Sequence, residues 1–473
     1  MRFGQLLKQY IDDSETSVRL FSKITDLNRG WLYNIFSGKK KLSEDKFHKM
    51  LDNFPFSDAQ KTLLRDAYYE ELYGVNAFNK IQFIISELKS LSKNDDSKYC
   101  FPNYVQTYNS NVSFINNKYN LFDSICYLLR TSSLKDNSLI YTNFSYAQEE
   151  IDTAMYSCLL EKQDITFSHI VNFDNRGNDV HNLRNIFRSL KYAKHKINTY
   201  FYYDNNHLMQ LDSLFPYFIV TNAGVLLYNN SMDNGLLILD KSVINEFSKK
   251  AENILKQCTP LVKFPDNIFS LKEYLLQNVN CSYTDSISSR PCLTGYLNVN
   301  MLDSIINESI PNREYTIHSI YEWIKVSDFS THSILHLNTT QGFSDFAQNG
   351  HVSYFSTKYA KPLSIKNRIK ILKKCIETNE SQHAFCLLDD NKVTLPDDIR
   401  IELFPPGTNL IYGYLENHDF SDMGSFVILL SNNVMFSDFN NFKDYITRNN
   451  FYLNDKYTQL FFKDLLLKLE TIK

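Results

Sequence analysis

Glycine and proline are scarce in this chain, with 13 and 11 of the 473 residues. Both supply the tight turns of loop-rich and repeat-turn folds, so their scarcity argues against those architectures. Long apolar runs are also missing. The most apolar stretches, residues 215–228 and 425–436, fall short of the roughly 18 apolar residues that a membrane helix needs. The N-terminus MRFGQLLKQY lacks the apolar core of a signal peptide, so we expect a soluble cytoplasmic protein without a membrane partner.

The eight cysteines form no C-x-x-C pair, and their spacing is irregular. Most lie within apolar runs such as SICYLL and AFCLL, which favours buried free thiols in a reducing cytosol. The chain also lacks a glycine-rich phosphate loop and the strings H-E-x-x-H, G-x-S-x-G and H-x-K-x-x-x-x-D. We therefore predict no catalytic residue, no cofactor and no enzymatic activity.

One histidine pair has the spacing that zinc sites use on helices. His332 and His336 are four residues apart, but their segment THSILHLN is typical of a strand. Residues four apart on a strand are separated by about 13 Å, which is too far for shared ligation. The sequence therefore predicts no metal site.

The net charge of −3 is unevenly distributed along a chain whose length predicts two to four domains. Residues 1–51 hold ten Lys and Arg against six Asp and Glu, whereas the remainder holds forty against forty-seven. A basic N-terminal segment favours a protein whose N-terminus meets a polyanion. A solvated charged surface is the alternative explanation of the same asymmetry.

Residues 1–74 have the apolar spacing and the N-cap residues of short helices. The expected helices are 2–12, a second from Thr16 or Ser17, a third from Asn28 to about Ser37, a fourth from Ser43 to about Asn53, and a fifth from Ser57 to Tyr73. The second helix is expected to bury Val18, Leu20, Phe21 and Ile24. Gly38 is expected to end the third helix.

Five short helices with a lysine run after the third resemble the Cro/repressor-type helix-turn-helix domain of Xre-like transcriptional regulators. The resemblance depends on the closing Ser37-Gly38-Lys39-Lys40 and on core positions at Leu20, Ile24, Leu27, Leu32 and Ile35. Phe21 stands where this family usually has a small residue, and the turn before the third helix is one residue longer. Gly30 is expected to make room for Phe21.

The resemblance implies that the third helix is a recognition helix in the major groove of DNA. Its outward residues are expected to be Asn28, Arg29, Trp31, Tyr33 and Asn34. Among them, Arg29 and Asn34 suit bidentate contacts with guanine and adenine respectively. Phosphate contacts are expected from Lys39, Lys40 and Lys41. The alternative is a small helical bundle that contacts protein.

The C-terminal part shows one order of elements twice: helix, strand, turn, strand, strand, strand, helix. The first set spans residues 181–258 and the second spans residues 364–448. Strands at 165–174 and 351–359 are expected to precede the sets. Matching turns at residues 204–206 and 389–391 lie 185 positions apart. This pattern predicts a duplicated module, or else a common arrangement of hairpins and helices.

We therefore predict an α+β multidomain protein: an all-α helix-turn-helix domain followed by two α+β modules with mainly antiparallel sheets. The expected boundaries are 1–74 for the helix-turn-helix domain, 75–100 for a connector helix, 101–260 for the first module, 261–293 for a linker and 294–473 for the second module. A cleft between the two modules is a suitable place for a ligand.

These features predict a DNA-binding transcriptional regulator that acts as a homodimer. Its partners are expected to be double-stranded DNA and a small-molecule or protein effector that the C-terminal modules sense. Two alternatives stay open. One is a protein-interaction factor of immunity or antitoxin type with a DNA-binding domain, and the other is an enzyme fused to such a domain.

Overall fold

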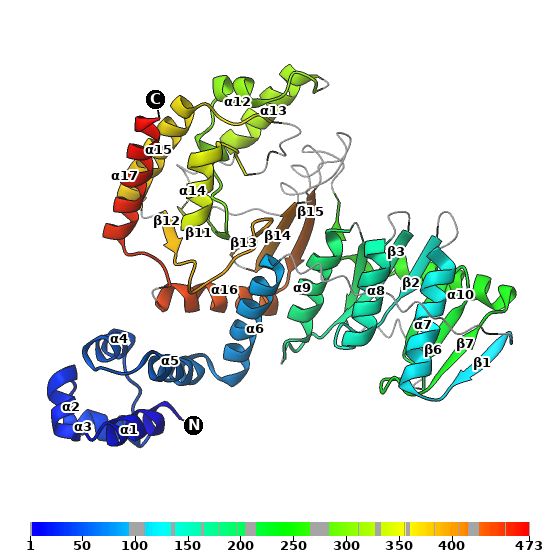
Figure 1. Cartoon of the computed structure of the whole chain (residues 1–473), viewed down its shortest axis with the longest axis horizontal. Helices are drawn as coiled ribbons and strands as arrows, with labels where there is room; N and C mark the ends of the chain where they lie inside the picture. The colour runs from blue at the N-terminus through cyan, green and yellow to red at the C-terminus, as the bar shows by residue number, and fades with distance from the viewer. Residues whose placement is uncertain are drawn as a thin grey trace. The chain divides into compact units, whose positions relative to one another are not determined.

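The computed structural model describes residues 2–93, 108, 110–133, 138–161, 165–177, 179–195, 197–203, 214–264, 283–310, 312–326, 333–353, 355, 360–382, 384–405, 407–414, 425–449 and 451–472. Packing divides the chain into two units (Figure 1). The head is Met1–Ile84 together with Asn440–Asn450, and the body is Ile85–Phe439 together with Phe451–Lys473. The domain boundaries expected from the sequence stay a prediction.

The N-terminal part of the head is a series of short helices whose ends follow local sequence signals. The helices are α1 (Phe3–Asp13), α2 (Val18–Thr25), α3 (Arg29–Phe36), α4 (Glu44–Asn53), α5 (Asp58–Tyr73) and α6 (Val75–Ser92), whose last residues belong to the body. Ser17 caps α2 through the Leu20 N–H, and Ser57 with Gln60 forms a capping box on α5. Gly38 follows α3 with φ at +70°, so the expected caps and the expected helix end are confirmed.

Helices α1 and α3 cross at Gly4. A Cβ atom at this position would lie 2.0 Å from the backbone oxygen of Ile35, so only glycine allows so close an approach. Leu7 of α1 and Leu32 of α3 are fully buried nearby in the core. The tight crossing in this head is therefore between its first and third helices.

The expectation that α2 buries Leu20 and Ile24 is wrong. Leu20 is 50% exposed and Ile24 is 38% exposed. The buried face of α2 carries Phe21 and Thr25, which lie one turn apart. Because α2 is only eight residues long, it buries one narrow stripe of side chains. Leu20 and Ile24 lie beside that stripe and stay at the surface.

Phe21 is accommodated by aromatic residues and not by space at Gly30. Its ring centroid lies 4.8 Å from that of Phe54 and 6.3 Å from that of Phe56. A Cβ atom added at Gly30 would contact only the side chain of Asn28. The expected pairing of Phe21 with Gly30 is therefore wrong, because the segment after α4 supplies the packing.

The body contains two mixed sheets with helices packed on them. The first module comprises β1 (Val112–Ile115), α7 (Lys118–Ser133), β2 (Ser138–Thr142), α8 (Glu149–Glu161), β3 (Ile165–Phe173), α9 (His181–Ala193), β4 (Asn198–Tyr203), β5 (Tyr217–Thr221), β6 (Val225–Tyr228), β7 (Gly235–Ile238), α10 (Lys241–Leu255) and β8 (Thr259–Pro260). Within the described residues its strand order is β1-β7-β6-β5-β2-β3-β4-β8. Among these described strands, only β2, β3 and β4 pair in parallel.

The second module has its own sheet. It comprises β9 (Val262–Lys263), β10 (Tyr283–Ser288), the short helix η2 (Thr294–Tyr296), α12 (Val299–Ile305), α13 (Arg313–Val326), β11 (Ser333–Thr339), α14 (Thr340–Asn349), α15 (Ile365–Gln382), β12 (Phe385–Leu388), β13 (Ile399–Phe404), β14 (Thr408–Tyr414), β15 (Ser425–Ser431), α16 (Asn433–Arg448) and α17 (Asp455–Thr471). In the described part of the chain the strand order is β12-β11-β10-β13-β14-β15-β9. Again three strands, β10 to β12, pair in parallel.

Six strands of each sheet correspond in chain order, position and direction. The series β7-β6-β5-β2-β3-β4 of the first sheet matches β15-β14-β13-β10-β11-β12 of the second. In both, three parallel strands are followed by a three-strand antiparallel meander on the other side of the first strand. The α+β class is confirmed, and the repeat predicted from the sequence is present as a repeated topology.

One element of the predicted repeat is misplaced. The counterpart of β3 is β11, and the described residues 351–353 and 355 of the expected strand 351–359 are not in a strand. The rest of that segment and the turn at 204–206 lie outside the described residues. The sequence identified the β11 segment as a strand but did not place it in the repeat, because two helices, α14 and α15, separate β11 from β12 where α9 alone separates β3 from β4.

Residues 259–263 connect the two sheets directly. In this segment β8 pairs with β4 of the first sheet, and β9 pairs with β15 of the second. Both β9 and the central strand β10 fall within residues 261–293, which the sequence suggested as a linker. The sheets of the body are therefore adjacent at this segment.

The five cysteines whose side chains are described are free thiols: Cys126, Cys258, Cys292, Cys375 and Cys386. His336 is buried on β11, and burial lowers its pKa to about 3, whereas His332 lies outside the described residues. Over the described residues, no three His, Cys, Asp or Glu side chains are grouped to hold a metal. No helix in the described part of the chain combines the length and apolarity of a membrane span.

Candidate nucleic-acid interface

The turn between α2 and α3 is held by local hydrogen bonds. Asp26 adopts the left-handed conformation with φ at 57°, which ends α2. The Leu27 N–H donates to the Ser22 carbonyl at 3.2 Å, and the Ser22 hydroxyl donates back to the Leu27 carbonyl at 2.5 Å. With Leu27 buried at 3% exposure, this turn fixes where α3 begins.

The outward face of α3 carries Arg29 and Tyr33, one helical turn apart. Arg29 is exposed and Tyr33 is 54% exposed, whereas Leu32 and Ile35 face the core. Asn34 is half-buried beside them. The structure therefore exposes Arg29 and Tyr33 and leaves Asn34 partly exposed, and the contact of these residues with DNA stays a prediction.

Asn28 caps α3 as its position in the sequence suggests, whereas Trp31 has partners that the sequence did not reveal. The Asn28 side-chain oxygen accepts from the backbone N–H of Gly30 at 2.8 Å and of Trp31 at 3.3 Å, so it serves as the N-cap of α3. Trp31 is half-buried, and the Lys46 ammonium lies 3.9 Å from its ring centroid. The Lys40 ammonium lies 5.7 Å from the same ring. These contacts hold two cations beside α3.

The lysine run after α3 divides into two kinds of residue. The backbone N–H groups of Lys39 and Lys40 donate to the Asn34 carbonyl at 2.8 and 3.2 Å, which fixes the chain as it leaves the helix. Both lysines are exposed. Lys41 instead donates from Nζ to the Glu71 carbonyl at 2.8 Å. Lys39 and Lys40 are thus the better placed of the three to contact phosphate.

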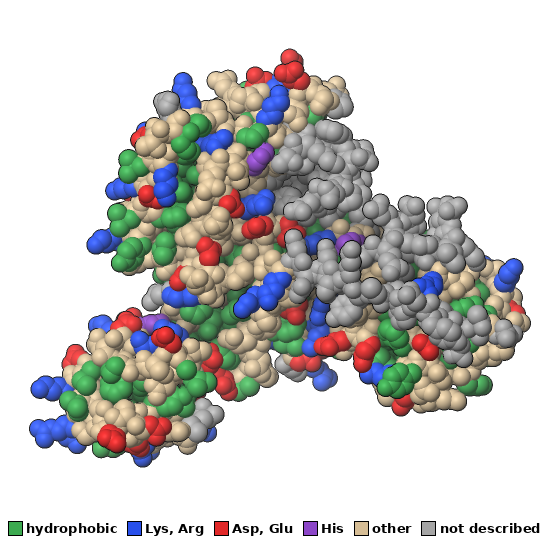
Figure 2. Space-filling view, viewed as in Figure 1, with side chains coloured by type: hydrophobic (Ala, Val, Ile, Leu, Met, Phe, Trp, Pro, Cys, Tyr) green, Lys and Arg blue, Asp and Glu red, His purple; other side chains and the backbone are tan. Residues whose placement is uncertain are grey.

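The segment from the start of α3 to the residue before α4 carries basic residues and no acidic ones. From Leu27 to Ser43 the sequence has four basic residues, Arg29 and Lys39–Lys41, and no acidic residue. Figure 2 shows Lys and Arg side chains projecting from the head, with hydrophobic side chains beside them. Lys46 of α4 adds a cation that sequence spacing could not assign to this surface, because it reaches Trp31 only in the folded head.

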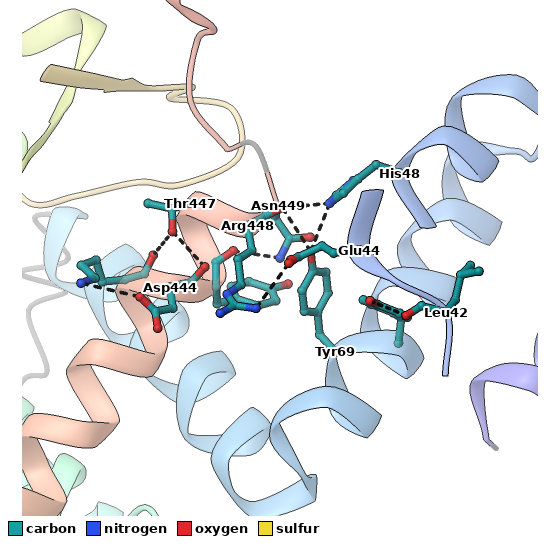
Figure 3. A network of polar contacts seen from close by, with 11 residues as sticks. Leu42, Glu44, His48, Tyr69, Asp444, Thr447, Arg448 and Asn449 are labelled. Atoms are coloured by element: carbon teal, nitrogen blue, oxygen red, sulfur yellow. Dashed lines mark hydrogen bonds and ion pairs between the residues drawn. The ribbon is translucent and has the colours of Figure 1, made fainter. Parts of the chain in front are cut away.

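A second polar cluster joins α4 and α5 to the last turn of α16 within the head (Figure 3). His48 Nε2 lies 2.8 Å from the Arg448 carbonyl oxygen, and the Tyr69 hydroxyl lies 3.2 Å from the same oxygen. Glu44 pairs with the Arg448 guanidinium at 3.3 Å and lies 3.1 Å from the Tyr69 hydroxyl. Burial, reinforced by the Glu44 carboxylate, raises the pKa of Tyr69 well above its ordinary value, so this phenol stays a neutral donor.

Comparison with known proteins assigns no family. No protein-family model and no curated protein matches the chain. Among solved structures, an archaeal chromatin protein that binds DNA, TrmBL2, is 10% identical with a TM-score of 0.23, over 50% of this chain and 84% of that one.

Two enzymes are similar to the same low degree. A phosphatidylserine synthase of Haemophilus influenzae is 11% identical with a TM-score of 0.24, over 83% of this chain and 98% of that one. A polyphosphate kinase of Porphyromonas gingivalis is 10% identical with a TM-score of 0.23, over 76% of this chain and 53% of that one. Likeness this weak transfers neither a fold nor an activity.

Proposed function

We propose that the protein is a transcriptional regulator whose head binds double-stranded DNA through α3. The observation that carries the proposal is the exposed face of Arg29 and Tyr33 on a capped helix, within a stretch of sequence that holds four basic residues and no acidic one. The body serves to sense a small-molecule or protein effector, and the proposal assigns it no catalytic step. Two heads of a homodimer would meet half-sites about one helical turn apart.

The residues of this face have distinct roles in the proposal. Arg29 donates two hydrogen bonds to a guanine, and Asn34 pairs with an adenine in the major groove. Tyr33 contacts a thymine methyl or a sugar. Lys39 and Lys40 contact phosphates and add affinity without sequence information. Asn28 orients α3 by capping it. Trp31 keeps Lys40 and Lys46 near the phosphate backbone of the bound DNA.

The double variant Arg29→Ala, Asn34→Ala tests sequence recognition. Each bidentate base contact discriminates by about 1–3 kcal/mol, so we expect the preference for specific over scrambled DNA to fall at least tenfold. An electrophoretic shift with DNA flanking the gene of this protein, against a scrambled duplex, measures the ratio. Lys8→Ala, an exposed charge on α1, is the control and should leave the ratio unchanged. If the ratio of affinities for specific and scrambled DNA were unchanged in the double variant, α3 would not be the recognition helix.

The double variant Lys39→Gln, Lys40→Gln tests the phosphate contacts. Each lost phosphate contact lowers the salt dependence of binding by about 0.9 in the slope of log affinity against log salt. We expect affinity for specific and scrambled DNA to fall by the same factor, with a slope shallower by roughly 1.8. Titration at three salt concentrations gives the slope. Loss of specificity at an unchanged slope would contradict this assignment.

The exposed apolar residues of α2 favour a second candidate, a head that contacts protein. Leu20 and Ile24 lie one turn apart and are both at the surface. Leu20→Ser, Ile24→Ser should leave DNA binding unchanged if the head binds DNA only through α3. The interaction factor would be favoured over the regulator by two results together. The wild-type chain would show no preference for a DNA sequence, and the double variant would no longer capture a protein partner that the wild-type chain captures.

A further inference from the structure

Strand β1 is the outermost strand of the first sheet (Figure 1). Within the described residues it pairs only with β7, antiparallel and without a bulge, from Val112↔Ile238 to Ile115↔Gly235. Six strands of this sheet have a counterpart in the second sheet, and β1 is outside that set. Strand β1 is therefore an addition to the repeated topology, and its outer side is an edge of the sheet.

The other three outer strands of the two sheets each have a feature that disfavours further pairing. Strand β8 has two residues, one of them Pro260, and β9 has two residues, one of them Lys263. The Leu453 N–H donates to the Leu387 carbonyl of β12 at 2.7 Å, so the segment before α17 covers the edge of β12. Short length, proline, lysine and a covering segment are the usual protections of a sheet edge against another chain.

Strand β1 has none of these protections in the described part of the chain. Residues 101–117, which include the strand, contain no charged residue, and none of Val112 to Ile115 is proline. Val112 is 50% exposed and Phe114 is 78% exposed, and their side chains lie on the same face of the sheet because they are two residues apart. Tyr119, at the start of α7, is 86% exposed. An uncharged strand with exposed apolar side chains thus forms this edge.

The backbone of β1 has hydrogen-bonding groups that β7 does not use. The Leu239 N–H donates to the Asn111 carbonyl at 2.7 Å, so the odd-numbered residues of this segment form the hydrogen-bonded pairs with β7. Val112 and Phe114 therefore direct their N–H and C=O groups away from β7. The Ser110 hydroxyl donates to the Val112 carbonyl at 3.0 Å, and the described residues supply no partner for the two backbone groups of Phe114. An added strand would meet donors and acceptors at the spacing of an antiparallel ladder.

We propose that β1 is the homodimer interface of this protein, where it pairs antiparallel with β1 of a second copy. A twofold interface brings a surface against itself, so any net charge on that surface would repel its own copy. The uncharged stretch around β1 has no such repulsion, and it offers no charge that would select an acidic or a basic partner. Lys118, the next charge along the chain, is paired with Glu150 at 2.6 Å. The inference rests on the proposed function only in supplying the dimer that the regulator requires.

The outward backbone groups favour a register in which the pairing stays within β1. With the twofold axis at Ser113, Val112 lies opposite Phe114 of the second copy, and the two residues exchange both of their hydrogen bonds. Each such pair also places a valine beside a phenylalanine on one face, a combination that stabilises sheets. Ser113 then faces Ser113 of the second copy in a non-hydrogen-bonded pair, with Cα atoms about 4.5 Å apart.

Cross-linking of the full-length chain tests this register. In the Ser113→Cys variant, the two introduced thiols would face each other across the twofold axis at a separation that a disulfide spans. We expect diamide to cross-link this variant at least about tenfold faster than Ser231→Cys, because the dimer holds the thiols at a high effective concentration. Ser231 is an exposed residue of the β6–β7 turn and is the control, and the wild-type chain gives the background of its eight cysteines. Equal cross-linking rates in the two variants would overturn the inference.

Phe114→Glu tests the interface itself, and its fold should stay intact because Phe114 is exposed. We expect the dissociation constant of the dimer to rise at least about tenfold, because two carboxylates would enter the interface without a counter-charge. Sedimentation equilibrium of the full-length chain measures this constant. Leu467→Glu on α17, where the leucine is 62% exposed, is the matched control and should leave the dimer unchanged.

Two results of this measurement would overturn the inference. A wild-type chain that stays monomeric at its highest soluble concentration would leave the β1 edge to a strand of another protein. Dissociation by Leu467→Glu and not by Phe114→Glu would assign the dimer to α17. Both experiments are made without DNA, so a dimer through β1 in a chain that shows no preference for a DNA sequence would overturn the proposed function alone.

Discussion

Gly4→Val is expected to unfold the head and abolish DNA binding. The added Cβ would lie 2.0 Å from the Ile35 carbonyl oxygen, and backbone atoms cannot move aside as a flexible side chain does. Overpacking of this kind costs about 3 kcal/mol, a large share of the stability of a small helical unit. Hydrogen exchange of α1 and α3 amides in the full-length chain measures the loss, with electrophoretic shift as the functional readout.

Gly30→Ala is the matched control, because Gly30 also lies in a helix of the head. A Cβ at this position meets only the Asn28 side chain at 3.3 Å. Alanine is favoured over glycine in helices by about 1 kcal/mol, so stability should stay level or rise slightly. Equal effects of the two substitutions would show that α1 and α3 do not cross at Gly4.

Phe462→Ala is expected to destabilise the second module by about 3–5 kcal/mol, the usual effect of removing a buried aromatic side chain. Phe462 of α17 is 1% exposed, and its ring centroid lies 4.9 Å from that of Phe343 and 6.1 Å from that of Phe385. Helix α17 thus closes the core of this module. Exchange rates of β11 and β12 amides, together with the midpoint of urea unfolding, measure the loss.

Leu467→Ala is the control on the same helix, since Leu467 is 62% exposed. Its effect should stay within about 0.5 kcal/mol. The alternative role for the apolar face of α17 is to pair two chains. If Phe462→Ala dissociated an oligomer and left the stability of the second module unchanged, the packing role of α17 would be refuted.

The helices of the head were predictable because their signals are local. Ser17, Asn28 and Ser57 cap helices within three residues of themselves, and Gly38 ends one. Burial was less predictable. Leu20 and Ile24 have the spacing of a helical face. The face of a short helix that becomes buried is set by neighbouring residues such as Phe54, and sequence spacing does not identify those neighbours.

The site was predictable in part for the same reason. Arg29 and Tyr33 lie outward as the periodicity indicates, because Leu32 and Ile35 fix the buried side of α3. The partners of Trp31 and Lys41 were not predictable. Both bind residues on other helices, Lys46 and Glu71, whose approach depends on how the helices pack.

The sequence by itself determined the helical N-terminal region, the basic segment from Leu27 to Ser43 and the repeated order of strands and helices, because periodicity, caps and charge are properties of neighbouring residues. Only the tertiary structure decided that the strands of both modules have one topology and that β8 and β9 connect the two sheets. It also decided that α16 completes the head. Contacts such as that of His48 with Arg448 join residues 400 positions apart, and no local pattern encodes them.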